Sequence, residues 1–282
     1  MISIASGKGG TGKTTLSTAL AWVAGLTGDV VFLDCDVEEP DAHFYLKPDW
    51  SEEREVSVSV PAIDEARCNG CGRCADFCRY NALAVIKGSV LTFPELCHSC
   101  GGCLLACPLK CISETERRIG VIREGRSGNI TLRQGLLDIG EPVAVSIIRQ
   151  LKSSLEDDAL IIADCPPGTG CNMVSSVEAS DFCILVTEPS PFGRHDLELA
   201  HRVALELEIR HGVVINRAAP SNRIIEDYCE SEGIECLGKI PYDRRIAEFC
   251  SRGEILPEIA PAWREEISRM LERVTALCPS SL

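Results

Sequence analysis

The chain has 282 residues, of which 45% are hydrophobic and 25% are charged, and its formal net charge is −14. This length suits one large α/β domain with a small insertion, and the acidic balance excludes a nucleic-acid-binding surface, which needs clustered Lys and Arg. No apolar run approaches the length of a transmembrane helix, and Met1 leads into a strand rather than a signal peptide, so we expect a cytoplasmic protein that does not bind membranes.

The first predicted elements are a buried strand over residues 2–5 and a helix over residues 14–26. Between them, residues 7–14 read GKGGTGKT and match the phosphate-binding pattern G-x4-G-K-[ST]. The backbone N–H groups of such a loop surround phosphate oxygens, Lys13 reaches the β and γ phosphates, and the Thr14 hydroxyl can ligate Mg2+. We therefore expect the nucleotide to contact Gly9, Gly10, Thr11, Gly12, Lys13, Thr14 and Thr15.

Lys8 adds a second lysine to this loop, which has the form K-G-G-x-G-K-T. This form resembles the deviant Walker A loop of the MinD/ParA family, the nitrogenase iron protein and the Mrp-type iron–sulfur carriers. The resemblance implies a P-loop NTPase fold with a mostly parallel, doubly wound sheet. It also implies an ATP-dependent dimer, either with a second copy or with a related ATPase, in which Lys8 reaches the partner's nucleotide and stabilises the charge of the transferred phosphate.

The next predicted strand, over residues 30–33, ends in an Asp-Cys-Asp sequence that is similar to the D-x-D motif of this family. The resemblance implies that Asp34 supports the Mg2+ shell and that Asp36 orients the attacking water. It therefore adds Asp36 to Lys8 and Lys13 as a catalytic residue.

The ATPase pattern then breaks and resumes near Glu141, with strands predicted over residues 54–61 and 119–132. Between these strands the pattern C-x2-C-x2-C-x3-C occurs twice, 29 residues apart (97 minus 68). Its cysteines are Cys68, Cys71, Cys74 and Cys78 in the first copy and Cys97, Cys100, Cys103 and Cys107 in the second. Eight thiols at this spacing favour two [4Fe–4S] clusters, and a four-thiolate zinc site is the alternative.

The second copy ends in Cys-Pro and resembles a bacterial two-cluster ferredoxin, whereas the first has Arg79 where that family has proline. The resemblance implies that the fourth cysteine of each copy crosses to the other cluster. The implied ligand sets are Cys68, Cys71, Cys74 and Cys107 for one cluster and Cys97, Cys100, Cys103 and Cys78 for the other. We expect a ferredoxin-like domain over residues 62–114, inserted into an ATPase domain of residues 1–61 and 115–282. Two interpretations of Cys111 remain: it is an alternative cluster ligand, or it is a buried thiol.

Residues 160–164 form an apolar strand that ends in Asp164, which is typical of a Walker B motif. We expect Asp164 to hold Mg2+ through water and residues 166–170 to form a switch that senses the γ-phosphate. Asn216 and Pro241 lie in segments that resemble the base-binding segments of the family. A final amphipathic helix over residues 261–278 is expected to dock on the sheet.

Together these motifs predict a Mg2+-dependent ATPase that converts ATP to ADP and phosphate. Its nucleotide state would control electron transfer through two [4Fe–4S] clusters to a redox or iron–sulfur partner protein. Two alternatives stay open: an ATPase that assembles or carries iron–sulfur clusters, and a positioning or scaffold ATPase in which the clusters are structural.

Overall fold

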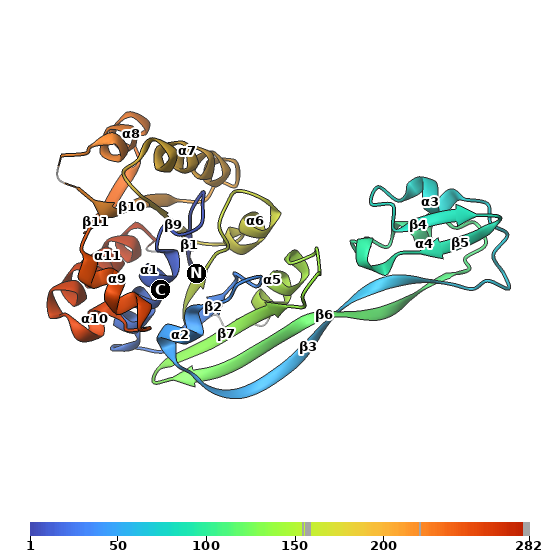
Figure 1. The fold of residues 1–282 in the computed structure, drawn as a ribbon, viewed down its shortest axis with the longest axis horizontal. Helices are drawn as coiled ribbons and strands as arrows, with labels where there is room; N and C mark the ends of the chain where they lie inside the picture. Colours follow the sequence, from blue (N-terminus) through green and yellow to red (C-terminus); the bar gives the residue numbers. More distant parts are fainter. Residues whose placement is uncertain (154, 156–158, 220, 279–282) are drawn as a thin grey trace.

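The computed structural model describes residues 1–153, 155, 159–219 and 221–278. Its centre is a nine-stranded sheet with the order β11-β10-β9-β1-β8-β2-β7-β6-β3, and neighbouring strands are parallel except at β7–β6 and β6–β3. The strands are β1 (Ile2–Ala5), β2 (Val30–Asp34), β3 (Asp49–Ile63), β6 (Ile112–Ser127), β7 (Ile130–Leu137), β8 (Leu160–Asp164), β9 (Phe182–Thr187), β10 (His211–Ala218) and β11 (Glu235–Pro241). The predicted α/β class with a mostly parallel sheet is confirmed (Figure 1).

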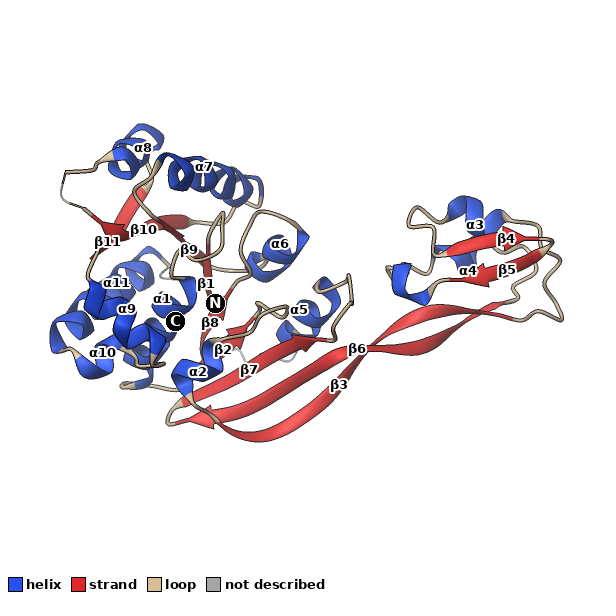
Figure 2. Ribbon diagram, in the orientation of Figure 1, coloured by secondary structure: helices blue, strands red, loops and turns tan. Residues whose placement is uncertain are grey.

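Helices cover both faces of this sheet (Figure 2). One face carries α1 (Lys13–Gly25), α2 (Ala42–Leu46), α9 (Arg244–Ser251), α10 (Leu256–Ile259) and α11 (Pro261–Leu277), and the other carries α5 (Val145–Lys152), α6 (Cys171–Val177), α7 (Pro191–Glu206) and α8 (Ile224–Glu232). In β2, Phe32 is buried in the core beside α1, and the next residue, Leu33, is buried in the core beside α5. Because both faces are covered, the central strands are continuous apolar runs.

The C-terminal helix docks on the sheet as predicted. Ile267, Met270 and Val274 of α11 are buried in the same core as Leu16 and Leu20 of α1. Among the described residues, no helix has both the length and the apolar character needed to cross a membrane.

Strands β3 and β6 are longer than the central strands and pair antiparallel over residues 49–63 and 112–126. Strand β7 accompanies β6 only over residues 120–127. Beyond this point β3 and β6 continue as a two-stranded arm (residues 57–63 and 112–119), which leads away from the main sheet (Figure 1).

The prediction of one strand over residues 119–132 is wrong. This segment contains the end of β6, a two-residue turn at Gly128 and Asn129, and the start of β7, with Ser127 paired to Ile130. Gly128 has a φ of 58°, a left-handed conformation that glycine adopts at no steric cost. A Gly-Asn pair between two strands is a typical hairpin signal, which the apolar pattern obscured.

The arm ends in a small unit that we call the cysteine module (residues 64–111). It contains α3 (Arg73–Phe77), β4 (Leu83–Ile86), β5 (Ser89–Thr92), the 3-10 helix η1 (Pro94–Leu96) and α4 (Gly102–Ala106). The helices α3 and α4 contact each other, and each begins after a glycine in the left-handed region, Gly72 with φ 80° and Gly101 with φ 67°. The two cysteine patterns therefore share one local structure, as their repeated spacing predicts.

Candidate functional site

The phosphate loop connects β1 to α1 at the carboxyl end of the central strands. Gly10 and Gly12 have φ values of 73° and 93°, which residues with side chains rarely adopt. A Cβ atom at Gly12 would also lie 2.3 Å from the Nδ2 atom of Asn216. Lys13 is buried at the start of α1. The backbone of the loop is therefore tightly constrained, and Lys13 is already held inside it.

Two carboxylates lie side by side beneath this loop. Asp34 ends β2, Asp164 ends β8, and the two residues are register partners. Both are buried, and within the described part of the chain neither oxygen of Asp164 has a hydrogen-bond partner, nor has Oδ1 of Asp34. Burial raises the pKa of Asp164 to about 7, and burial together with the Asp164 charge raises the pKa of Asp34 well above its usual range. Buried carboxylate oxygens without donors fit a hard divalent cation such as Mg2+.

Two further carboxylates follow β2. Burial raises the pKa of Asp36 to about 6, and the positive charge of Lys13 opposes this rise. Burial also raises the pKa of Asp41, with the Thr14 hydroxyl and Lys13 acting against it. The charge of Lys13 thus acts on Asp36, Asp41 and Asp164, and the Thr14 hydroxyl acts on Asp41 and Asp164, while Asp34 lies beside Asp164 in the sheet.

Gln134, on β7, is a member of this site that the sequence did not indicate. Its Nε2 atom donates to Oδ2 of Asp34 at 3.1 Å and lies 2.9 Å from Nδ1 of His43. The backbone N–H of Ala42 donates to the same Asp34 oxygen at 3.2 Å. Gln134 is buried and is the register partner of Asp34. It therefore orients one oxygen of Asp34 and leaves the other available.

Lys8 is held within its own chain. Its Nζ atom forms an ion pair with Oε1 of Glu188, which lies directly after β9. The second oxygen of Glu188 accepts from Nη1 of Arg217 at 2.9 Å, and Nη2 of Arg217 donates to the Gly10 carbonyl at 3.2 Å. These bonds lower the pKa of Glu188, with Lys8 as the largest cause. Sequence reasoning missed both Glu188 and Arg217, because no motif links them to the loop.

The residues predicted to contact the base lie near the carboxyl ends of two neighbouring strands. Asn216 belongs to β10, and its Nδ2 atom donates to the Thr11 carbonyl at 2.7 Å. Pro241 ends β11 and is exposed. Thr15 lies in the first turn of α1, with its Oγ1 atom 3.7 Å from Sγ of Cys250. Asn216 thus supports the phosphate loop directly, and its contact with a base stays a prediction.

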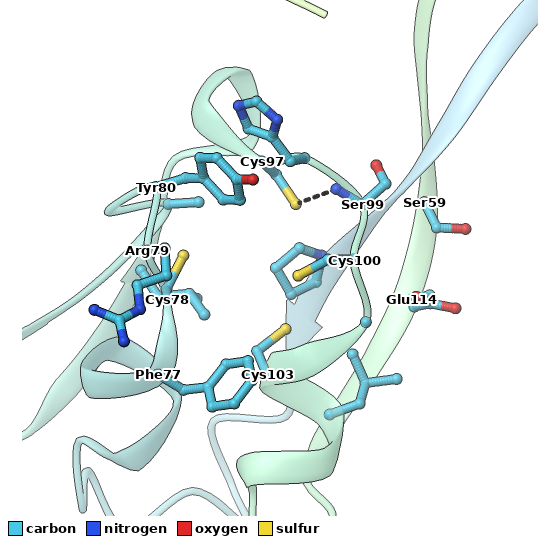
Figure 3. A pocket seen from close by; sticks show the side chains of 16 residues that line it. Ser59, Phe77, Cys78, Arg79, Tyr80, Cys97, Ser99, Cys100, Cys103 and Glu114 are labelled. Atoms are coloured by element: carbon cyan, nitrogen blue, oxygen red, sulfur yellow. Dashed lines mark hydrogen bonds between the residues drawn. The ribbon is translucent and has the colours of Figure 1, made fainter. Parts of the chain in front are cut away.

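The cysteine module contains two cavities lined by thiols. Figure 3 shows the first, which Cys97, Cys100 and Cys103 of the second pattern line together with Cys78 of the first. The backbone N–H of Ser99 donates to Sγ of Cys97 at 3.4 Å. At its rim, His98 stacks on Tyr80 with 3.6 Å between the ring centroids, and both rings line the cavity.

The second cavity is lined by the complementary set of thiols, Cys68, Cys71 and Cys74 of the first pattern and Cys107 of the second. Cys111 lines it as a fifth thiol. The structure therefore groups the eight cysteines in the two sets that the ferredoxin resemblance implies.

The donor sets of the two cavities suit [4Fe–4S] clusters, each of which takes four protein thiolates. In the segments that the structure describes, no group of three His, Cys, Asp or Glu side chains converges as the ligands of one ion do. A cube of four irons and four sulfides instead needs four thiolates spaced around a cavity. The four thiols of each implied set line one cavity, which fits this requirement.

Comparison with known proteins agrees with the nucleotide site. The model of the CobQ/CobB/MinD/ParA nucleotide binding domain matches residues 2–256. An uncharacterized protein of Methanocaldococcus jannaschii is 36% identical over 277 residues, which cover 97% of this chain and 95% of the relative. An iron-sulfur cluster carrier protein of Pyrococcus horikoshii is 25% identical, with 93% and 81% covered. The structure of the septum site-determining protein MinD of Pyrococcus horikoshii, complexed with Mg-ADP, superposes with a TM-score of 0.60 at 20% identity, covering 97% of this chain and 94% of MinD.

Proposed function

The chain belongs to the CobQ/CobB/MinD/ParA nucleotide-binding family, and we propose that it is a Mg2+-dependent ATPase whose nucleotide state controls electron transfer through two [4Fe–4S] clusters. The main support for this proposal is the pair of thiol-lined cavities in the cysteine module. Two strands of the nucleotide-binding sheet extend to form the arm that ends in this module. The ATPase fold of the family would provide ATP hydrolysis. The eight cysteines, in two crossed sets, would bind the clusters that transfer electrons.

The nucleotide site supports ATP hydrolysis by positioning and charge neutralisation. Thr14, Asp34 and Asp164 would hold Mg2+, directly or through water, and this ion would neutralise phosphate charge. Lys13 would bind the β and γ phosphates. Asp36 is subject to the positive charge of Lys13 and would orient the attacking water.

The cysteine module supports two clusters. Cys68, Cys71, Cys74 and Cys107 would hold one, Cys97, Cys100, Cys103 and Cys78 would hold the other, and the clusters would store and pass on single electrons. We place this ferredoxin-like domain at residues 62–114, between ATPase segments of residues 1–61 and 115–282. The similarity to an iron-sulfur cluster carrier protein also supports an iron–sulfur protein.

The connection between the two parts supports their coupling. Strand β3 begins at Asp49, soon after Asp36 and Asp41, so a movement of that loop on ATP binding would act on the strand that continues into the arm. Gln134 connects Asp34 to β7, which pairs with the other arm strand, β6. We propose that two such chains, or this chain and a related ATPase, dimerise when ATP binds, that Lys8 then reaches the partner's phosphates, and that a redox protein docks at the module.

A second candidate is an ATPase that assembles or delivers iron–sulfur clusters, which the similarity to a carrier protein favours. A carrier releases its cargo, whereas an electron carrier keeps its clusters through turnover.

The test is an anaerobic redox titration of the iron-loaded chain without nucleotide, with ATP and with a non-hydrolysed analogue. Electron transfer under nucleotide control predicts a shift in at least one cluster potential when the analogue binds, and unchanged iron content after many ATP turnovers. Transfer of iron and sulfide to an apo-ferredoxin during turnover would instead identify a carrier. If the cluster potentials do not change and no iron or sulfide is transferred, the remaining interpretation is a scaffold ATPase in which the clusters are structural.

A further inference from the structure

The second cavity of the cysteine module has one thiol more than a four-iron cluster needs. Each iron of a [4Fe–4S] cluster takes one protein thiolate, so four cysteines complete the set. Five line this cavity: Cys68, Cys71, Cys74, Cys107 and Cys111. The surplus thiol, Cys111, is buried and lies outside both repeated patterns. The first cavity has no such surplus among the described residues that line it.

The surplus thiol lies beside one particular ligand. The Sγ atoms of Cys107 and Cys111 are 3.5 Å apart. Two thiolates bound at about 2.3 Å to one tetrahedral metal ion are about 3.8 Å apart. The two sulfurs therefore have nearly the separation of two thiolates that can reach the same metal ion.

The two thiols are attached to different parts of the fold. Cys107 directly follows α4, the helix that carries Cys103. The Cys111 carbonyl accepts from the backbone N–H of Asp64 at 2.8 Å, where the arm strands begin to pair. Between the two thiols, the Lys110 N–H donates to the Cys107 carbonyl at 3.3 Å, and Lys110 has a φ of 49°. The tight turn keeps both sulfurs at one corner of the cavity, with Cys107 at the end of α4 and Cys111 at the edge of the module that joins the arm.

We infer that Cys111 is an alternative ligand for the iron that Cys107 binds. This inference rests on the proposed clusters. In such an exchange, Cys111 would give its proton to Cys107 and would take the place of Cys107 as the thiolate on that iron, with no change in the number of irons or sulfides or in oxidation state. Cys111 would thereby move one attachment from the end of α4 to the edge of the module that joins the arm.

The test uses the full-length chain, reconstituted anaerobically with ferrous iron and sulfide. Iron and sulfide per chain and the electron paramagnetic resonance spectrum of the reduced protein are measured for wild type and for C107A, C111A and the double variant C107A/C111A. The matched control is C78A, because Cys78 is the equivalent crossing cysteine of the other cavity, which only four thiols line in the described part of the chain. Circular dichroism and ATP binding check that each variant folds.

We expect about eight irons per chain in the wild type, in C111A and in C107A, the last with an altered spectrum from its new ligand. We expect C107A/C111A and C78A to lose one cluster, or one iron from it. If C107A loses as much iron as the double variant, while the wild type binds both clusters, Cys111 is only a buried thiol and the inference is wrong. If the wild type binds no clusters, the proposed function fails as well, so the two failures are distinguishable.

Discussion

Lys8 and Glu188, 180 residues apart in the chain, form an ion pair within one subunit. Arg217 binds the same carboxylate, so Glu188 carries two cationic partners while it remains only 19% exposed. A lysine held in this way cannot at the same time reach the nucleotide of a second subunit. The proposed dimerisation through Lys8 would therefore require the ion pair with Glu188 to break first, so that Glu188 would compete with the partner's phosphates for Lys8.

Replacing Glu188 should release Lys8. We expect E188Q to dimerise at about two- to fivefold lower protein concentration in the presence of ATP, because a partly exposed ion pair contributes up to about 1 kcal/mol. ATP hydrolysis per chain should rise with dimerisation. Sedimentation velocity with a non-hydrolysed ATP analogue measures the association.

Two variants control this result. E198Q removes a carboxylate of similar kind, which pairs with Arg202 on the surface of α7, and should not change dimerisation. The double variant K8A/E188Q should not show the stronger dimerisation of E188Q, because Lys8 is then absent. Weaker dimerisation of E188Q would instead show that Glu188 is needed to hold the phosphate loop through Arg217.

Gln134 should affect the binding of the metal ion rather than the binding of the nucleotide base. We expect Q134L to weaken Mg2+ binding about tenfold, because the Asp34 carboxylate loses the donor that orients it. Isothermal titration of Mg2+ in the presence of ADP measures the effect. Q150L provides the control, since Gln150 donates to the Ser57 carbonyl on the arm and does not contact the acidic site. Equal effects of the two substitutions would contradict the role of Gln134.

Local patterns predicted the parts of the site that are continuous in sequence. The phosphate loop, its flanking strand and helix, and the acids at the ends of β2 and β8 follow from short motifs. Gln134 and Glu188 did not, because they join the site only through strand register and a contact across 180 residues, and no spacing rule records either. The length of the arm was also not evident, since its strands pair residues that lie on both sides of the cysteine module.

Asp164 should lower the free energy of unfolding when no metal is bound, because both of its buried oxygens lack hydrogen-bond partners in the described structure. We expect D164N to raise the free energy of unfolding of the metal-free chain by about 1–3 kcal/mol above pH 7, where Asp164 is ionised and a neutral amide replaces an unpaired buried carboxylate. The same variant should lose Mg2+-dependent ATP hydrolysis at least about 100-fold. Urea unfolding with EDTA and a phosphate-release assay measure the two effects. Loss of stability in the metal-free D164N chain would contradict this account.

The raised pKa of Asp164 also predicts how stability depends on pH. In the unfolded chain this carboxyl titrates near pH 4, whereas in the folded chain its pKa is about 7. The folded state therefore binds more protons between these values, and the metal-free protein should lose stability as the pH rises from about 4 to about 7. Thermal unfolding at several pH values in EDTA measures this slope. D164N should reduce the slope, and Asp34 and Asp36, whose pKa values are also raised, should account for the remainder. Saturating Mg2+ should reverse the slope, because the cation binds the ionised form.

The cysteine module should depend on its clusters for order. Few of its residues are buried, among them Cys74, Ala82 and Leu83, whereas large apolar side chains such as Phe77 and Leu105 are exposed. A unit of this size without a sufficient apolar core needs disulfides or metal to fold. We therefore expect anaerobic removal of iron with a chelator to abolish the hydrogen-exchange protection of residues 64–111, while α1 and the central strands keep theirs. ATP binding should persist in the stripped protein, because the nucleotide site is built on the main sheet. If the module keeps full protection without iron, its fold is independent of metal and the clusters are not its core.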